Sequence, residues 1–364
     1  LVGKCVVSTK TGGIPTLIEN DINGYLVEPG NVDELASVLQ TVIDESVKRN
    51  LIAKAAKEHA EKMFNINVTI GKYRSLYENL KLERSYAGSP CSKNAKYNIL
   101  YHYSSQQVNT GSPKVLISLI EGLERAHFSP YFLADHEGEL CRALKQRRVD
   151  IIWGRTNSIS AASLHRNFSN VIKLIRLLQR HRISLVHLNE LGWNSELAVA
   201  ARIMHIPVFF HIHNPERITK RNINCNIGSK YLFVSNSLAS QNNAHKVLGD
   251  KAEILYNPIN VDKFSQGQSI RCELGLPDGV PIVGCIAQIS KRKGTDIFIE
   301  TAAKLHETLP EAWFLLAGPD AKGEEDFASQ MRQKVATLGL ERQLKFIGSR
   351  DDVENTLARI DIFF

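Results

Sequence analysis

The chain has 364 residues, of which 43% are hydrophobic and 23% charged, a composition typical of globular proteins with packed cores. The net charge of +7 favours an anionic partner, such as a phosphate ligand, an acidic lipid surface or a nucleic acid. No apolar run is long enough to cross a bilayer, and the six scattered cysteines form no Cys-x-x-Cys pair, which argues against membrane spanning, zinc sites and disulfide frameworks.

The first part of the chain combines two short strands with three helices. KCVVST and NGYLVEPGN have the composition of strands, and TGGIP between them predicts a turn. Apolar residues then recur at helical spacing over residues 32–85, with Asn31 as the expected N-cap. The small, polar and basic segment YAGSPCSKNAK that follows is typical of a linker. We therefore divide this part into a segment 1–84 and a linker 85–96.

Strands and helices alternate over residues 97–256. Apolar strands are predicted at 97–105, 129–134, 149–153, 184–188, 207–213 and 231–235, and helices at 114–126, 138–148, 165–182 and 195–205. A β-α-β-α order with apolar strands indicates a doubly wound parallel sheet.

A second alternating unit covers residues 257–364. Its strands are expected in PIVGCIAQI, AWFLLAGP, LKFIG and DIFF, with helices between them. Parallel sheets bury their strands on both faces, so this sheet is incomplete within 257–364 taken alone.

The stretch VGCIAQISKRKGTDIF (283–298) joins a strand, a basic loop and the start of a helix. Open α/β sheets bind ligands at the carboxyl ends of their strands, where helix N-termini favour anions. Lys293 and the amides after Gly294 are therefore candidates to hold a diphosphate and to stabilise its charge as it leaves. The alternative is an ordinary solvated basic loop.

The order of these features resembles the nucleotide-binding half of retaining glycosyltransferases with the GT-B fold, with glycosyltransferase family 4 (the glycosyl transferases group 1 sequences) as the nearer match. NPINVDKF, ISKRKG, LLAGP and DDVENTLARIDIFF follow the family's order. In that family an Arg and a Lys-Gly pair grip the donor diphosphate. The resemblance assigns these roles to Gln288, Lys293 and Gly294, although Gln288 supplies no charge where the family has Arg.

Residues 97–256 resemble the acceptor half of the same family. The family's glycine loop after the first strand corresponds to NTGS, with Gly111 in place of two adjacent glycines. The family's active-site histidine follows a strand of the type PVFFHIH, and His213 fits that position best. His211, two residues earlier, and His187, in SLVHLNE, are the weaker candidates.

The opening residues resemble the end of the family's nucleotide-binding domain. KCVVSTKTGGIPTLIENDINGYLVEPGN has the family's Val-Val strand, Gly-Gly-x-Pro turn and strand ending in Pro-Gly, with Cys5 for Pro and Thr16 for Glu. If this segment completes a donor site, Gly12 and Gly13 approach the donor.

The family's pair of glutamates, with seven residues between them after the DIFF strand, has no counterpart in this sequence. One account is a fragment that contains the end of one module and most of a second, and such a fragment is expected to be inactive. The other account is a circular permutation, in which residues 1–84 complete the sheet begun by residues 281–364.

The resemblance implies a GT-B enzyme that transfers a sugar from a nucleoside-diphosphate-sugar to a hydroxyl of a glycan, polysaccharide or lipid-linked acceptor, with retention. The departing diphosphate would assist proton removal, so neither a metal nor a cofactor is expected. Two alternatives stay open: a non-catalytic scaffold, and a nucleotide-sugar epimerase of the same fold. The sequence leaves the sugar, the base and the acceptor undecided.

Residues 165–182 predict a basic amphipathic helix, with Phe168, Val171 and Leu178 among its apolar positions. A helix that covers the sheet is favoured, and peripheral contact with an anionic membrane is the alternative. No nucleic-acid recognition module is recognisable. The cysteine pattern predicts a cytoplasmic protein, with the inner face of the membrane as the alternative location.

Overall fold

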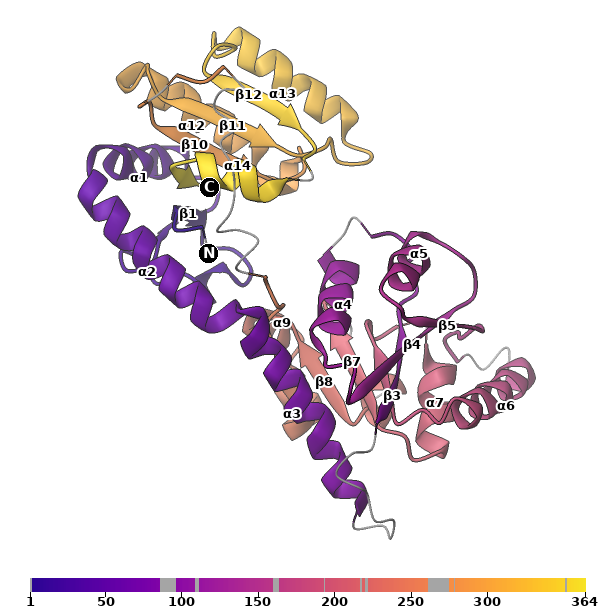
Figure 1. Cartoon of the computed structure of the whole chain (residues 1–364). Coiled ribbons are helices and arrows are strands. Elements are labelled where there is room, and N and C mark those ends of the chain that lie inside the picture. The colour runs from indigo at the N-terminus through magenta and orange to yellow at the C-terminus, as the bar shows by residue number, and fades with distance from the viewer. Residues whose placement is uncertain are drawn as a thin grey trace. The chain divides into compact units, whose positions relative to one another are not determined.

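The chain folds into two compact units, each built on a parallel sheet with helices on both faces (Figure 1). Unit 1 contains residues 1–63 and 260–364, and unit 2 contains residues 64–259. The computed structural model describes residues 2–85, 96–108, 111–159, 164–192, 194–216, 218–219, 222–260, 275–277, 279–350 and 352–364. The expectation of two doubly wound α/β domains is confirmed.

The sheet of unit 2 has the strand order β5-β4-β3-β6-β7-β8-β9, with parallel pairs throughout. Numbered within the unit, this order is 3-2-1-4-5-6-7, which is the doubly wound pattern with its switch point between β3 and β6. The strands are β3 (Tyr97–His102), β4 (Phe128–Ala134), β5 (Asp150–Trp153), β6 (Leu185–Leu188), β7 (Val208–Ile212), β8 (Lys230–Phe233) and β9 (Ala252–Ile254).

Helices cover both faces of this sheet because successive strand residues point to opposite sides. Leu100 packs in the core on one side and Tyr101 in the core on the other. The Tyr101 side is covered by α3 (Ile66–Ser85), α4 (Gly111–Gly122) and α5 (Glu139–Gln146). The Leu100 side is covered by α6 (Leu164–Arg180), α7 (Ser195–Ile203), α8 (Asn224–Ile227), α9 (Asn236–Gln241) and α10 (Ala244–Leu248).

Helix α6 packs on the sheet through a narrower face than the sequence predicts. Val171, Leu174 and Leu178 are buried, whereas Phe168, expected on the apolar face, is 69% exposed. These three residues lie three to four positions apart, so they form one stripe, and Phe168 lies at the edge of that stripe. Among the described residues, none of the helices has an apolar stretch that could span a bilayer.

The sheet of unit 1 is assembled from both ends of the sequence. Its order is β12-β11-β10-β13-β1-β2, so β13 lies between β10 and β1, with Cys5 opposite Ile362. Counted from β10 this is again the order 3-2-1-4-5-6. The strands are β10 (Ile282–Ile286), β11 (Trp313–Ala317), β12 (Leu344–Gly348), β13 (Ile362–Phe363), β1 (Cys5–Thr9) and β2 (Tyr25–Val27).

Helices α1 and α12 lie side by side on one face of this sheet (Figure 1). Asn31 caps α1 as expected, because its side chain accepts a hydrogen bond from the Glu34 amide at 3.0 Å. The Thr308 hydroxyl donates to Gln40 Oε1 at 2.8 Å between the two helices. The helices of unit 1 are α1 (Val32–Asp44), α2 (Ser46–Phe64), α12 (Thr295–Thr308), α13 (Glu325–Thr337) and α14 (Val353–Arg359).

The units divide the chain differently from the sequence-based domains. The sequence places residues 64–84 with 1–63, whereas in the structure α3 packs on the sheet of unit 2. The tyrosines of α3 explain this difference, because Tyr73 and Tyr77 are buried in the core of unit 2. Most of the predicted linker 85–96 lies outside the described residues.

Candidate functional site

Three strands of unit 2 end side by side at the switch point of its sheet. His102 ends β3, Leu188 ends β6 and Ile212 ends β7. The Asn189 amide donates to the His102 carbonyl at 2.9 Å, which continues the ladder beyond the strands. Ligands bind at such carboxyl edges in open α/β sheets, so the residues after these strands form the first candidate site.

His213 is held at this edge by Asn189. The Asn189 amide nitrogen donates to the Ser112 carbonyl at 3.2 Å, so its oxygen faces His213 Nε2 at 3.0 Å. That oxygen can only accept, so the Nε2–H of His213 donates and Nδ1 keeps a free lone pair. Burial lowers the pKa of His213 to about 4, and the ring is therefore neutral near pH 7.

Gly111 is the first residue of α4, next to the Ser112 carbonyl that Asn189 binds. A Cβ built on Gly111 meets no atom within 4 Å, so the space beside its backbone is open. The two residues before it, Asn109 and Thr110, lie outside the described residues. Through Ser112 and Asn189 the structure connects the predicted glycine loop to His213.

The two weaker histidine candidates are buried and bonded to α3. His211 Nε2 lies 3.1 Å from the Tyr73 hydroxyl, and His187 Nδ1 lies 2.8 Å from the Tyr77 hydroxyl. Burial lowers both pKa values, that of His187 to about 3. Both side chains have no exposed surface, so they serve the packing of α3 and not the ligand edge.

In unit 1, the loops after β10 and β11 are joined by backbone hydrogen bonds on either side of Gln288. The Ala287 amide donates to Ala317 and the Ile289 amide donates to Pro319, both at 2.9 Å. A Cβ on Gly318 would lie 1.9 Å from the Ala287 carbonyl oxygen, so glycine alone allows this approach. Gln288 is exposed at the carboxyl edge of the sheet as a result.

The basic loop that follows is closed by Ser290 and Thr295. The Thr295 hydroxyl donates to the Ser290 carbonyl and accepts from the Ser290 amide, both at 3.2 Å. The turn Lys291–Lys293 leads into Gly294, which is the N-cap residue of α12 and has a φ of +69°. Glycine has no side chain, so the helix begins without a side-chain cap. The first amides of α12 therefore have no capping oxygen from a described side chain.

Charge is concentrated on this turn. Lys291, Arg292 and Lys293 are exposed and form no ion pair with the described residues. The Ser290 hydroxyl is buried without a hydrogen-bond partner in the described part of the chain. Such an orphaned donor beside uncapped helix amides and unpaired cations fits an anionic ligand.

Gly12 and Gly13 follow β1, which is separated from β10 by β13 alone. Gly12 has a φ of +55° and a Cβ there would meet nothing within 4 Å, and Gly13 leads into the short turn Ile14–Thr16. Both lie at the same sheet edge as Gln288, because all strands of this sheet run parallel. Among the described residues, no group of three or more His, Cys, Asp or Glu is arranged to hold a metal.

Sequence reasoning missed Asn189 and Ser290. Each is a single polar residue directly after a predicted strand, and only that position distinguishes it from other Asn and Ser residues. Their roles depend on which strands are neighbours, which the sequence does not state.

The family comparisons match both units. The family described as Glycosyltransferase Family 4 matches residues 110–263, within unit 2 apart from its last few residues. The family described as Glycosyl transferases group 1 matches residues 1–59 and 267–364, the two segments that share the sheet of unit 1. The chain belongs to the GT-B glycosyltransferases of the family 4 type. The family prediction is therefore confirmed.

Several curated relatives of this family 4 chain are glycosyltransferases. The lipopolysaccharide core biosynthesis mannosyltransferase LpsB of Rhizobium meliloti is 28% identical over 90 residues, which is 25% of this chain and 26% of LpsB. The sulfoquinovosyl transferase SQD2 of Arabidopsis thaliana is 38% identical over 63 residues, 16% of this chain and 12% of SQD2. The chain thus spans less than a third of the length of these relatives.

Solved structures support the GT-B fold of this family member. HepE of Anabaena, crystallised with UDP, matches with a TM-score of 0.59 and 20% identity over 73% of each chain. A glycosyltransferase from Rickettsia africae matches with a TM-score of 0.59 and 20% identity over 74% of this chain and 72% of its own. The predicted fold class is confirmed.

Proposed function

We propose that the chain transfers a sugar from a nucleoside-diphosphate-sugar to a hydroxyl group of an acceptor, with retention at the anomeric carbon. The observation that carries this proposal is the turn before α12, where three cations without an ion pair, helix amides without a cap and the Ser290 hydroxyl without a hydrogen bond meet, as judged from the described residues. HepE, which shares the fold, has been crystallised with UDP and with UDP-glucose. LpsB and a relative from Corynebacterium glutamicum are named mannosyltransferases.

The turn before α12 suits a leaving diphosphate. Negative charge builds up on the diphosphate as the glycosidic bond breaks, and fixed donors stabilise that charge most when they need no rearrangement. Lys293 supplies a positive charge, Gly294 exposes the helix amides, and Gln288 supplies a neutral donor. In this scheme a diphosphate oxygen takes the proton from the acceptor hydroxyl, so proton and leaving group end on the same product.

His213 is proposed to bind a hydroxyl of the reacting sugar. Its Nε2–H is occupied by Asn189, so Nδ1 is free to accept an O–H from a ligand. A neutral histidine in this state neither repels a positively charged sugar centre nor competes for the acceptor proton. Its low pKa, caused by burial, keeps it in that state near pH 7.

The test is nucleotide binding by the full chain, measured by titration calorimetry with UDP and GDP. Lys293→Ala should weaken binding roughly 10- to 100-fold, because it removes a hydrogen bond to a charged group. Lys54→Ala is the matched control, since Lys54 lies on α2 with a 75% exposed side chain. If neither nucleotide binds the unmodified chain, or if the two variants behave alike, the donor site is wrong.

Transfer itself is checked by proton NMR of the anomeric signal. The full chain is incubated with UDP- or GDP-sugars and a panel of glycoside acceptors, and the product is expected to keep the donor's anomeric configuration. An inverted product would contradict retention while leaving nucleotide binding intact.

A further inference from the structure

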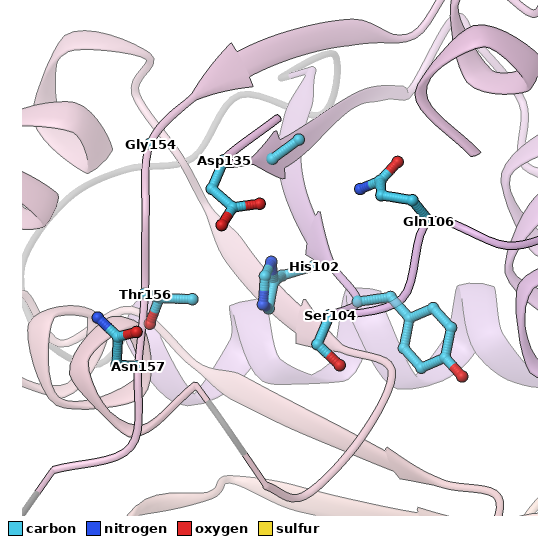
Figure 2. A pocket seen from close by; sticks show the side chains of 9 residues that line it. His102, Ser104, Gln106, Asp135, Gly154, Thr156 and Asn157 are labelled. Carbon is cyan, nitrogen blue, oxygen red and sulfur yellow. The ribbon is translucent and has the colours of Figure 1, made fainter. Parts of the chain in front are cut away.

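A polar cavity of about 240 Å³ opens at the carboxyl ends of β3, β4 and β5 in unit 2 (Figure 2). His102, Ser104, Gln106, Asp135, Thr156 and Asn157 supply polar side chains to its wall. It lies on the β4 side of β3, whereas Asn189 and His213 follow β6 and β7 on the other side. The cavity is therefore a neighbour of the predicted reacting position and not part of it.

His102 presents a fixed hydrogen-bond acceptor to this cavity. Its Nδ1 lies 3.1 Å from the Leu133 carbonyl, which can only accept, so Nδ1 carries the proton and Nε2 keeps its lone pair. Burial lowers the pKa of His102, so the ring stays neutral. The residue is 8% exposed, Glu190 Oε1 lies 4.0 Å from Nε2, and no described residue donates to that nitrogen. A ligand hydroxyl would satisfy it.

Gln106 and Asp135 offer complementary groups across the same space. The Gln106 oxygen accepts from the Cys141 amide at 3.3 Å, which leaves its amide nitrogen to donate. Figure 2 shows that nitrogen and the Asp135 carboxylate directed into the space beside His102. Asp135 Oδ1 is bonded to His136 at 2.6 Å, and Oδ2 lies 3.7 Å from Arg155 Nε, so a ligand hydroxyl would share Oδ2 with that exposed guanidinium. The cavity thus combines one donor with two acceptors.

The charge and size of the cavity select the class of ligand. Among the described residues the lining contains no Lys or Arg, and the Asp135 carboxylate would repel a phosphate. Arg155 lies 3.7 Å from Asp135 at the rim and is 72% exposed, so it partly balances that carboxylate. A volume of about 240 Å³ lies below the ~300–1,000 Å³ typical of pockets for drug-sized ligands. A single ring fits better than a chain.

We propose that this cavity binds one neutral, hydroxyl-bearing sugar ring of the acceptor, at a subsite beside the reacting position. Vicinal hydroxyls both donate and accept, so one ring can satisfy His102 Nε2, the Asp135 carboxylate and the Gln106 amide together. The Ser104 loop is pre-positioned for this, since Glu190 binds the Ser104 amide at 2.8 Å and its hydroxyl at 2.7 Å. The assignment of this ring to the acceptor rests on the proposed function.

The experiment is saturation-transfer NMR of the full chain with the methyl pyranosides of glucose, galactose, mannose and N-acetylglucosamine, with inorganic phosphate as the anionic probe. At least one glycoside should receive saturation, and added phosphate, whose own proposed site lies in unit 1, should not displace that glycoside. Asp135→Asn removes a charged acceptor and Gln106→Glu replaces the donor while keeping the oxygen that binds Cys141. Each should weaken glycoside binding roughly tenfold or more.

Asp150→Asn is the matched control, because Asp150 is exposed at the amino end of β5, away from the cavity. Failure of all four glycosides to bind, or equal binding by Asp135→Asn and Asp150→Asn, would overturn the subsite. Nucleotide titration of the same samples separates the two proposals. Glycoside binding without nucleotide binding would contradict the donor site alone. Nucleotide binding without glycoside binding would contradict the sugar subsite alone.

Discussion

Asn189 determines the state of His213 through the direction of its side-chain amide. The amide nitrogen donates to Ser112 and the amide oxygen accepts from His213, so an exchange of the nitrogen for an oxygen removes the bond to Ser112 and places a carboxylate against His213. A carboxylate within hydrogen-bond distance stabilises the charged form of an imidazole and raises its pKa by roughly one to three units.

Asn189→Asp should therefore raise the pKa of His213 from about 4 to between about 5 and 7. Imidazole nitrogen NMR across pH 3.5–8 measures both the pKa and the tautomer. Asn98→Asp is the control, because Asn98 lies at the opposite end of β3 and donates to His181. A His213 that titrates alike in both variants, or carries its proton on Nδ1 in the unmodified chain, would contradict the role given to Asn189.

The individual site residues were predictable only where a motif surrounds them. Lys293 and Gly294 were recognisable because a basic turn and a helix start follow a strand in one short stretch. The cavity residues His102, Gln106, Asp135 and Thr156 come from three separate strand ends, and they meet only because β3, β4 and β5 are neighbours. No local sequence pattern indicates that residues after three separate strands line one cavity.

Helix α3 is fastened to unit 2 by two hydrogen bonds between tyrosine and histidine. Tyr73 and Tyr77 are four residues apart, so both point to the same side of the helix. They reach His211 on β7 and His187 on β6, and all four side chains are buried. The second ring nitrogen of His187 has no partner in the described part of the chain, so Tyr77 is the one group that satisfies this ring.

Tyr77→Phe should lower the free energy of unfolding by about 1–3 kcal/mol, because it leaves the buried imidazole unsatisfied. Urea denaturation of the full chain measures this change. Tyr131→Phe is the control, since Tyr131 is half-buried and its hydroxyl has no hydrogen bond among the described residues. A loss no larger than that of the control would mean that the Tyr77 hydroxyl is not needed for the docking of α3.

The elements themselves were largely predictable, and their assignment to units was not. Helical periodicity located α1, α2 and α3, since apolar residues repeat at the spacing of one helix face. Nothing in that spacing says which sheet a helix covers. The tyrosine hydroxyls of α3 need hydrogen-bond partners, and buried histidines on a sheet can supply them. Only the three-dimensional structure shows that the sheet with these histidines is the one in unit 2.

The buried histidines make the stability of the molecule depend on pH. The folded pKa values of His187 and His213 are lowered to about 3 and about 4, and that of His211 is lowered as well, from a usual value of 6.5. Between these limits the unfolded chain binds protons that the folded chain does not. The contribution of these histidines to the free energy of unfolding is therefore complete above pH 6.5 and is lost as the pH falls to about 4 for His213 and about 3 for His187.

Urea denaturation at several pH values should show the unfolding free energy falling across this window, by up to about 1.4 kcal/mol per pH unit for each proton bound only on unfolding. His187→Gln should reduce the slope of the unfolding free energy against pH by the contribution of about one proton. His245→Gln, at an exposed position, should leave it unchanged. Equal slopes in the two variants would show that burial of His187 does not govern the dependence.

The sequence predicted two doubly wound sheets because each strand is apolar and each is followed by a helical pattern. It also offered the pairing of the first residues with the last strand as one of two accounts, and the structure has β1 bonded to β13. That pairing consists of hydrogen bonds between segments far apart in the chain, which residue patterns do not encode.

The contact between β1 and β13 also has a consequence for synthesis on the ribosome. Cys5 pairs with Ile362, which is synthesised about 350 residues later. At ~5–20 residues per second, the synthesis of the residues between them takes roughly 20–70 s. Unit 2 is completed during that wait, while β1 and β2 still have an unpaired edge. When residues 1–364 are expressed, the edge of β1 that pairs with β13 is therefore open to neighbouring chains until Ile362 is made, and the yield of folded chain should rise with chaperones and with slow growth.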